Sequence, residues 1–204
     1  MAGIGLLGGS FDPVHCAHVA LAERARDRLA LDCVRLVPAR RNPHKPVRPV
    51  ASDAHRVRML ELAVEGRRGL RVSTAELDRQ GPSYTLITVQ ELRREVGVDA
   101  PIYLLLGADS VGDLARWWRA DELVAQALVV PFDRPGCRLD EVLEGLVPRF
   151  GRAWVAAARA RRIDGPPMEV SSTQVRERLR AGLSVVGLVP EAVARYIAEQ
   201  GLYA

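Results

Sequence analysis

The chain has 204 residues, 48% of them hydrophobic and 26% charged, and this suits one well-buried α/β domain spanning residues 1–204. Its net charge of +4 suits an anionic ligand, but the basic residues are dispersed and aromatic residues make up only 5%, so no nucleic-acid partner is expected. Without a long apolar run or a secretory pattern, the sequence predicts a cytoplasmic protein with no membrane partner.

Strand-like and helix-like segments alternate along the chain, which is typical of a parallel sheet with helices on both faces. The sequence predicts strands at residues 4–7, 33–38, 70–73, 101–106, 128–130 and 153–157. It predicts helices at residues 19–31, 52–65, 83–96, 121–126, 173–181 and 191–200, and a short helix beginning at 110, with loops at 39–50 and 159–167. Ser52 and Ser83 are the expected N-caps of two helices. The predicted fold class is α/β, a Rossmann-like doubly wound parallel sheet with a C-terminal helical segment.

The turn after the first strand indicates phosphate binding. Residues 8–18 read Gly-Gly-Ser-Phe-Asp-Pro-Val-His-Cys-Ala-His and connect an apolar strand to a helix. Glycines let a backbone approach a ligand closely, and the free N–H groups at a helix start attract negative charge. His15 and His18 can donate further hydrogen bonds to phosphate oxygens. A helix-capping pair is the alternative.

A metal site on the protein is not expected. A two-histidine site would need a third Cys, Asp or Glu ligand, and none stands at a recognisable spacing from His15 and His18. Cys16, Cys33 and Cys137 are odd in number and lack a Cys-x-x-Cys pairing, which disfavours a disulfide framework or a structural zinc site.

Three further segments each allow a structural and a functional interpretation. Residues 169–176, Glu-Val-Ser-Ser-Thr-Gln-Val-Arg, form either an ordinary N-cap or an anion site at a helix start. Residues 38–45, Pro-Ala-Arg-Arg-Asn-Pro-His-Lys, form either a solvated basic loop or part of a ligand site, since the loop leaves the carboxyl end of a strand, where open α/β sheets bind ligands. Residues 82–85, Pro-Ser-Tyr-Thr, begin a helix, while Asp109 and Trp117 follow the strand that ends at Gly107. By themselves these residues would be caps and core filling.

Together the segments resemble the adenylyl- and cytidylyltransferases, whose His-x-x-His signature follows the first strand. The longer Gly-Gly-Ser-Phe-Asp-Pro form is most similar to the nicotinate-mononucleotide adenylyltransferases. Residues 170–176 resemble the superfamily's Ile-Ser-Ser-Thr-x-Ile-Arg with Val at both Ile positions, and residues 38–45 resemble Pro-x-x-x-Pro-Pro-His-Lys with Asn42 replacing a proline. Residues 185–203 match the closing helix pattern. The match is loosest between 130 and 167, and Ile87 stands where many members carry an acidic residue.

The resemblance implies transfer of AMP from ATP to nicotinate mononucleotide, which forms deamido-NAD and pyrophosphate by direct in-line attack without a covalent enzyme intermediate. The expected partners are these small-molecule substrates, and Mg²⁺ is expected to be bound mainly through the phosphates of ATP. The implied catalytic residues are His15 and His18. The implied ATP- and phosphate-binding residues are Gly8, Gly9, Ser10, Phe11, Gly107, Asp109, Ser172, Thr173 and Arg176. The implied mononucleotide-binding residues are His44, Lys45, Ser83, Tyr84, Thr85 and Trp117.

Other functions are less well supported. Adenylation of phosphopantetheine or CMP transfer to an alcohol phosphate is disfavoured by the Ser-Tyr-Thr segment and by Trp117. A dinucleotide-dependent oxidoreductase is disfavoured because no Gly-x-Gly-x-x-Gly follows the first strand and no acidic residue ends the second. A regulator that binds ATP without turnover stays open. So do the preference between nicotinate and nicotinamide mononucleotides and the oligomeric state, with homo-oligomerisation allowed.

Overall fold

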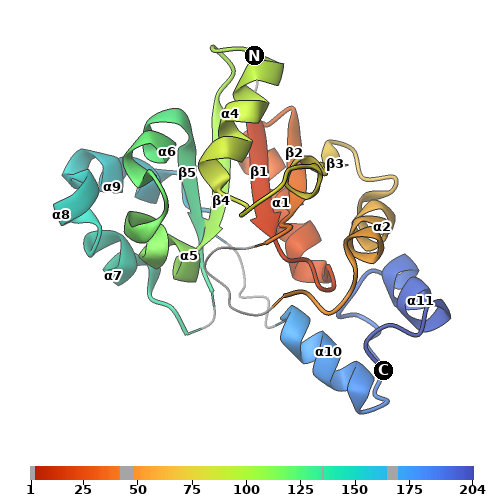
Figure 1. The fold of residues 1–204 in the computed structure, drawn as a ribbon. Coiled ribbons are helices and arrows are strands. Elements are labelled where there is room, and N and C mark those ends of the chain that lie inside the picture. The colour runs from red at the N-terminus through yellow and green to blue at the C-terminus, as the bar shows by residue number, and fades with distance from the viewer. Residues whose placement is uncertain (1–2, 42–47, 135, 165–169) are drawn as a thin grey trace.

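The fold is organised around a parallel sheet, seen in the computed structural model, which describes residues 3–41, 48–134, 136–164 and 170–204. Within these residues one sheet has five strands in the order β3-β2-β1-β4-β5, and every neighbouring pair is parallel (Figure 1). The strands are β1 (Ile4–Gly9), β2 (Cys33–Pro38), β3 (Leu70–Val72), β4 (Ile102–Gly107) and β5 (Leu128–Phe132). The predicted α/β class with a doubly wound sheet is confirmed.

Helices cover both faces of this sheet (Figure 1). The longer helices are α1 (Cys16–Arg28), α2 (Asp53–Val64), α4 (Thr85–Val96), α9 (Arg152–Ala160), α10 (Ser172–Arg180) and α11 (Glu191–Glu199). The shorter ones are α3 (Ala75–Asp78), α5 (Ala108–Asp113), α6 (Ala120–Gln126), α7 (Leu139–Glu144), α8 (Val147–Phe150) and the 3₁₀ turn η1 (Leu114–Arg116). None of the helices described is long and apolar enough to span a membrane.

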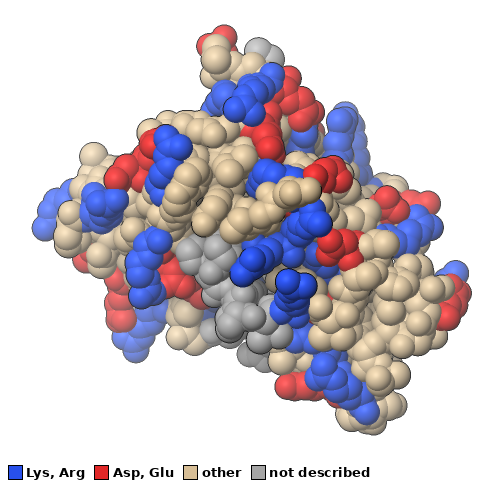
Figure 2. Space-filling model, viewed as in Figure 1, with Lys and Arg blue, Asp and Glu red and all other residues tan. Residues whose placement is uncertain are grey.

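The strand order creates a crevice between β1 and β4. From β1 the chain first builds β2 and β3 on one side, and it then crosses to β4 and β5 on the other. In open α/β sheets, ligands bind beyond the carboxyl ends of the strands at the place where the order reverses. Figure 2 shows a group of basic side chains near the middle of the face that carries these strand ends. The topology and these charges therefore make the region after β1 and β4 the candidate site for an anionic ligand.

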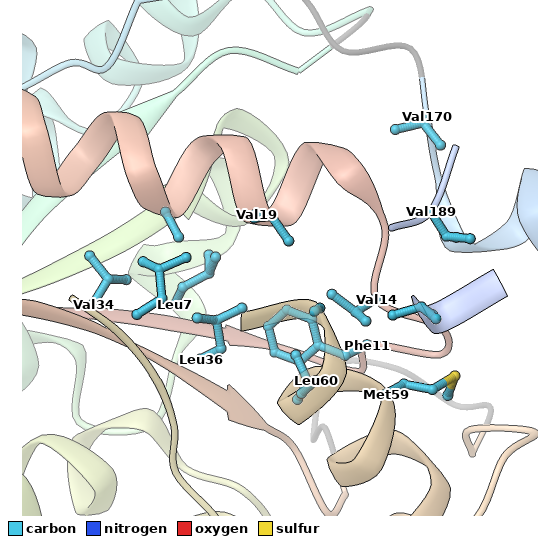
Figure 3. Close-up of a cluster of buried hydrophobic side chains, with 14 of the residues drawn as sticks. Leu7, Phe11, Val14, Val19, Val34, Leu36, Met59, Leu60, Val170 and Val189 are labelled. Carbon is cyan, nitrogen blue, oxygen red and sulfur yellow. The ribbon is translucent and has the colours of Figure 1, made fainter. Parts of the chain in front are cut away.

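Two apolar cores lie on opposite faces of the sheet, because successive strand residues point to opposite sides. Leu7, Leu36 and Leu105 pack with buried residues of α1, α2 and α11, and Figure 3 shows part of this cluster around Phe11 and Met59. The second core joins the alternate strand positions, such as Leu6, Leu104 and Val129, to α4, α6, α7 and α9. Burial on both faces explains why the strands read as continuous apolar runs.

Several predicted elements are wrong or displaced. The strand predicted at residues 153–157 is part of helix α9, whose Val155 and Ala158 are buried at the three-residue spacing of a helix face. Ser83 does not cap a helix, because α4 begins at Thr85 with Tyr84 as the N-cap. The loop predicted at 159–167 is only partly confirmed, because α9 continues to residue 160 and the buried Ile163 donates its N–H to the carbonyl of Pro131. Residues 165–167 lie outside the residues described.

Other boundaries shift by a few residues. The first helix begins at Cys16 instead of residue 19, and the short helix predicted from 110 begins at Ala108. The predicted N-cap at Ser52 is confirmed, since its side chain accepts the N–H of His55. Of the loop predicted at 39–50, residues 42–47 lie outside those described.

Candidate functional site

The turn after β1 brings two glycines and an aromatic ring to the beginning of α1. Phe11 has a positive φ of 48° and a buried ring. A Cβ added to Gly9 would lie 3.2 Å from this ring, so a side chain there would have to displace the ring by a few tenths of an ångström. A Cβ added to Gly8 would meet no atom within 4 Å and would enter the cleft that Gly8 lines. The backbone is therefore bare toward the cleft, as a phosphate-binding turn requires.

His15 and His18 lie face to face in the first turn of α1. The backbone N–H of His15 donates to Nδ1 of His18 at 3.2 Å, and the rings stack with centroids 3.6 Å apart. The edge of Phe11 packs against His18 at 4.8 Å between centroids. His15 is only 2% exposed, and this burial, followed by the positive charge of Arg134, lowers the pKa of His15 from 6.5 to about 3. His15 is therefore neutral near pH 7 and can donate one hydrogen bond from its ring.

Arg134 is a site residue that the sequence did not reveal. It follows β5, its guanidinium carbon lies 5.7 Å from the centre of the Phe132 ring, and its Nε lies 3.8 Å from Oδ1 of Asp109. A Cβ added to Gly107 would lie 3.0 Å from the same Nε, so the arginine passes over the end of β4. The arginine lies in the region between 130 and 167 where the sequence resemblance is loosest, and no local pattern marked it. Arg134 adds a positive charge at the crevice.

Helix α10 docks directly on the turn that leads to the two histidines. Oγ of Ser172 donates to the carbonyl of Pro13 at 2.9 Å, and Nη1 of Arg176 donates to the carbonyl of Asp12 at 2.6 Å. Nη2 of Arg176 also donates to Oγ1 of Thr173 at 3.3 Å. Two polar segments about 160 residues apart in sequence are thus held together, as a single site for a polyphosphate would need.

Asp12 connects this turn to two other parts of the chain. Its buried carboxylate accepts the N–H groups of Val50 at 2.7 Å and Ala51 at 3.0 Å, and the hydroxyl of Tyr203 at 2.8 Å. Burial, and then the hydrogen bond to Asp12, raises the pKa of Tyr203, so this phenol stays protonated. The far end of the 39–50 segment and the C-terminus are thereby fixed against the turn. The sequence did not single out Asp12 or Tyr203, because their partners are distant along the chain.

Arg56 fixes the other side of the turn from inside the protein. It is fully buried in α2, and its guanidinium donates to the carbonyls of Ser10 at 2.6 Å and Ala39 at 2.9 Å and pairs with Asp53 at 2.6 Å. This arginine ties the ends of β1 and β2 together. A signal was available, since Arg56 shares the inward helix face of Met59 and Leu60, where a charged residue needs a polar partner.

A cleft that is open to solvent continues from the turn between β1 and β4 toward α4. The residues that line it include Gly8, Gly9, Glu76, Ser83, Tyr84, Thr85, Asp109, Asp113, Trp117 and Trp118. Every charged residue in the described lining is acidic. The positive charges that suit phosphate, Arg134 and Arg176, stand beyond the lining. The cleft wall therefore suits a ring and sugar better than a polyphosphate.

Two neighbouring tryptophans lie at this cleft. Trp117 is half-buried and packs against the apolar core. Trp118 is 41% exposed and stacks on Tyr84 with centroids 4.8 Å apart, and the guanidinium of Arg119 covers it at 5.1 Å. The sequence pointed to Trp117 alone, but both indoles line the cleft.

Three of the residues predicted to bind the mononucleotide, Ser83, His44 and Lys45, do not have equally described contacts. Ser83 lines the cleft, but its Oγ accepts the backbone N–H groups of Arg40 at 3.0 Å and Arg41 at 3.3 Å. His44 and Lys45 fall outside the residues described, so their contacts stay predictions. In the described part of the chain, no group of three or more His, Cys, Asp or Glu side chains is placed to hold a metal ion.

The chain is similar to known proteins along nearly its whole length. The cytidylyltransferase-like family model matches residues 6–178. The chain is 42% identical to the probable nicotinate-nucleotide adenylyltransferase of Roseiflexus castenholzii, over 98% of this chain and 96% of the relative. It is 43% identical to the protein of the same name from Bordetella petrii, over 100% of both chains. Its fold resembles that of Plasmodium falciparum nicotinic acid mononucleotide adenylyltransferase complexed with NaAD, with a TM-score of 0.74 at 19% identity over 100% of this chain and 98% of the other.

Proposed function

The chain belongs to the cytidylyltransferase-like family and, within it, to the nicotinate-nucleotide adenylyltransferases, and we propose that it transfers AMP from ATP to nicotinate mononucleotide in NAD biosynthesis. The observation that carries this proposal is the contact between the turn at residues 12–18 and the start of α10 beside a cleft lined by aromatic residues. Residues 1–204 would act as one nucleotidyltransferase domain in the cytoplasm.

The reaction places few chemical demands on the protein. A phosphate oxygen of the mononucleotide, already ionised near pH 7, attacks the α-phosphorus of ATP. The new P–O bond forms as the bond to the bridging oxygen breaks, and pyrophosphate leaves from the opposite side. No covalent enzyme intermediate or strong general base is needed, so catalysis consists of positioning and of stabilising charge.

The charge-stabilising roles follow from the protonation and position of each group. We assign His18 to the α-phosphate and His15, as a neutral donor, to a neighbouring phosphate oxygen. Ser172, Thr173 and Arg176 would hold the leaving pyrophosphate, because a helix start, hydroxyls and a cation meet there. Arg134, at the end of β5, would add positive charge, while Gly107 and Asp109 would face the ribose.

The mononucleotide would occupy the cleft toward α4. Since the described lining offers no cation, the carboxylate of nicotinate would be held by the free N–H groups at the start of α4 and by the hydroxyl of Thr85. Trp117 would stack on the pyridine ring. His44 and Lys45 would contact the phosphate of the mononucleotide.

ATP would enter with magnesium on its phosphates. The ion would then be held through the phosphates, and His15, His18 and Arg176 would hold those phosphates. Bound in this way, the ion would neutralise part of the phosphate charge.

A coupled pyrophosphate assay tests the proposal. The protein is incubated with ATP and magnesium, and nicotinate mononucleotide, nicotinamide mononucleotide and phosphopantetheine are offered separately. We expect pyrophosphate with the first acceptor, and a nucleotide sensor would release none. In His18→Ala we expect kcat to fall roughly 10²–10³-fold, the usual effect of removing one donor to the reacting centre. His55→Ala is the matched control, since His55 bonds the hydroxyl of Tyr196 and does not line the cleft. Near-normal turnover in His18→Ala would overturn the assignment.

A further inference from the structure

We propose that Glu76 is a positioning residue that holds the start of α4 and the beginning of the 39–50 segment in one arrangement, and this rests on the proposed function. Glu76 lies in the four-residue helix α3, is only 6% exposed and lines the cleft. A carboxyl group beside a site for anionic substrates would repel them if it contacted them. We therefore expect Glu76 to act through the protein groups that it contacts and not through the substrates.

The first group beside Glu76 is the hydroxyl of Ser83, which lines the same cleft. Burial raises the pKa of Glu76, and the hydroxyls of Thr88 and Ser83 partly offset this effect. Oγ of Ser83 also accepts the backbone N–H groups of Arg40 and Arg41, and the N–H of Ser83 donates to the carbonyl of Arg41 at 2.9 Å. A hydroxyl has one proton to donate. Because both backbone donors point at the oxygen, the proton of the hydroxyl is left for another acceptor, and we infer that Glu76 accepts it.

The second group is the hydroxyl of Thr88, one turn into α4. It donates to Oε1 of Glu76 at 2.8 Å and accepts from Nη2 of Arg79 at 3.1 Å. Arg79 is itself fixed by Glu91 at 2.6 Å. Because Thr88 accepts from Arg79, its own proton goes to Glu76. Glu76 therefore needs one acceptor oxygen for Thr88 and a second for the proton of Ser83.

This network joins the two parts of the mononucleotide site. On one side, Ser83 precedes Tyr84 and Thr85, where the pyridine carboxylate would bind. On the other, Arg40 and Arg41 begin the segment that leads to the predicted phosphate contacts His44 and Lys45. Nη1 of Arg40 also donates to the carbonyls of Leu77 and Arg79, both at 3.2 Å, so α3 braces this backbone directly. Losing the acceptor at Glu76 should loosen both parts relative to each other.

Glu76→Gln tests this with almost no change in volume. The amide provides one acceptor, and its NH₂ group would face a hydroxyl that is itself a donor. We expect the KM for nicotinate mononucleotide to rise about tenfold, the effect of about one lost hydrogen bond, while the KM for ATP and kcat change less than about twofold. Glu95→Gln is the matched control, because this glutamate of α4 pairs with Arg35 at 2.6 Å, outside the network, and does not line the cleft; it should leave both KM values unchanged.

A double-mutant cycle separates positioning from general destabilisation. In a Ser83→Ala background, Glu76→Gln should have little further effect on the KM for the mononucleotide, since the shared contact is already gone. If Glu76→Gln does not fold, Thr88→Val replaces it as the test variant, because valine has nearly the shape of threonine without the hydroxyl. The same selective rise in the KM for nicotinate mononucleotide is expected. Thr88→Ser should restore the value.

Equal changes in the two KM values, no change, or additive effects in the cycle would each overturn the inference while the wild-type protein still makes pyrophosphate. A wild-type protein that makes none with any acceptor would overturn the proposed function, and this inference with it.

Discussion

Replacing His15 with asparagine is expected to make the folded protein more resistant to acid. In the unfolded chain His15 has its ordinary pKa of 6.5, and in the folded protein burial and then Arg134 lower that pKa to about 3. Above pH 6.5 neither state binds the proton. Between pH 6.5 and about 3 only the unfolded state does, so the free energy of unfolding falls as the pH falls through this window. Asparagine cannot titrate and removes this contribution.

The size of the effect follows from the difference between the two pKa values. At about 1.4 kcal/mol for each pKa unit, the full difference of 6.5 − 3, about 3.5, corresponds to at most about 5 kcal/mol. Between pH 7.5 and 4.5 only about two of those pKa units are crossed, so wild type should lose about 2–3 kcal/mol more than His15→Asn. His15 is 2% exposed, so solvent screening does not reduce this expectation.

Urea unfolding at four pH values from 7.5 to 4.5, for wild type and His15→Asn, measures this difference. Carboxylates contribute a pH dependence to both proteins, so the quantity of interest is the gap between the two curves. If the free energies of unfolding of the two proteins changed in parallel with pH, the expected role of His15 would be refuted. An NMR titration of His15 gives an independent check, since a midpoint near 6.5 would mean that the side chain is hydrated and not held neutral.

Two further outcomes are expected. Tyr203→Phe removes a hydrogen bond to the buried carboxylate of Asp12 and should lower the free energy of unfolding by about 1.5–3 kcal/mol, which corresponds to a fall in Tm of about 3–12 °C in a thermal melt. Tyr196→Phe, whose hydroxyl bonds Nδ1 of His55, should cost less because no buried carboxylate loses a partner. Equal losses in the two variants would argue against a special role for Asp12. Trp117→Ala should raise the KM for nicotinate mononucleotide much more than the KM for ATP, as measured by steady-state kinetics. The same measurement on Trp118→Ala will show which of the two indoles stacks on the pyridine ring. Equal effects of Trp117→Ala on the two KM values would mean that Trp117 is only a packing residue.

The sheet could be predicted from the sequence because its strands are buried on both faces and read as short apolar runs. The same reasoning failed at residues 153–157, where alanines and a valine form an apolar run of strand length. Gly151, with φ of 85°, precedes helix α9, and alanine favours a helix once Val155 and Ala158 find one apolar face to cover. A short apolar run does not by itself distinguish the two structures.

The candidate site could be predicted only where its residues lie in local patterns. Glycines after a strand, histidines at a helix start and hydroxyls before α10 are all visible within a few positions of one another. Asp12 and Tyr203 are 191 positions apart, and Ser83 meets Arg40 across 43 positions, so the sequence gives no sign of either contact. Ser83 stands just before a helical pattern and was therefore predicted to be its N-cap, whereas its hydroxyl accepts hydrogen bonds from Arg40 and Arg41 in another loop.

The charges around the site favour one orientation of the proposed substrates. The described cleft wall carries Glu76, Asp109 and Asp113 and no lysine or arginine, whereas Arg134 and Arg176 stand at the end where β1, β4 and α10 meet. A polyphosphate placed along the wall would meet carboxylates in a partly desolvated space, and at the other end it meets cations and free N–H groups. Nicotinate, with a carboxylate on its ring, works against this gradient. Under the proposed function, its carboxylate would therefore depend on the N–H groups at the start of α4. For this reason the loss of Glu76 is expected to affect the KM for nicotinate mononucleotide and not the KM for ATP.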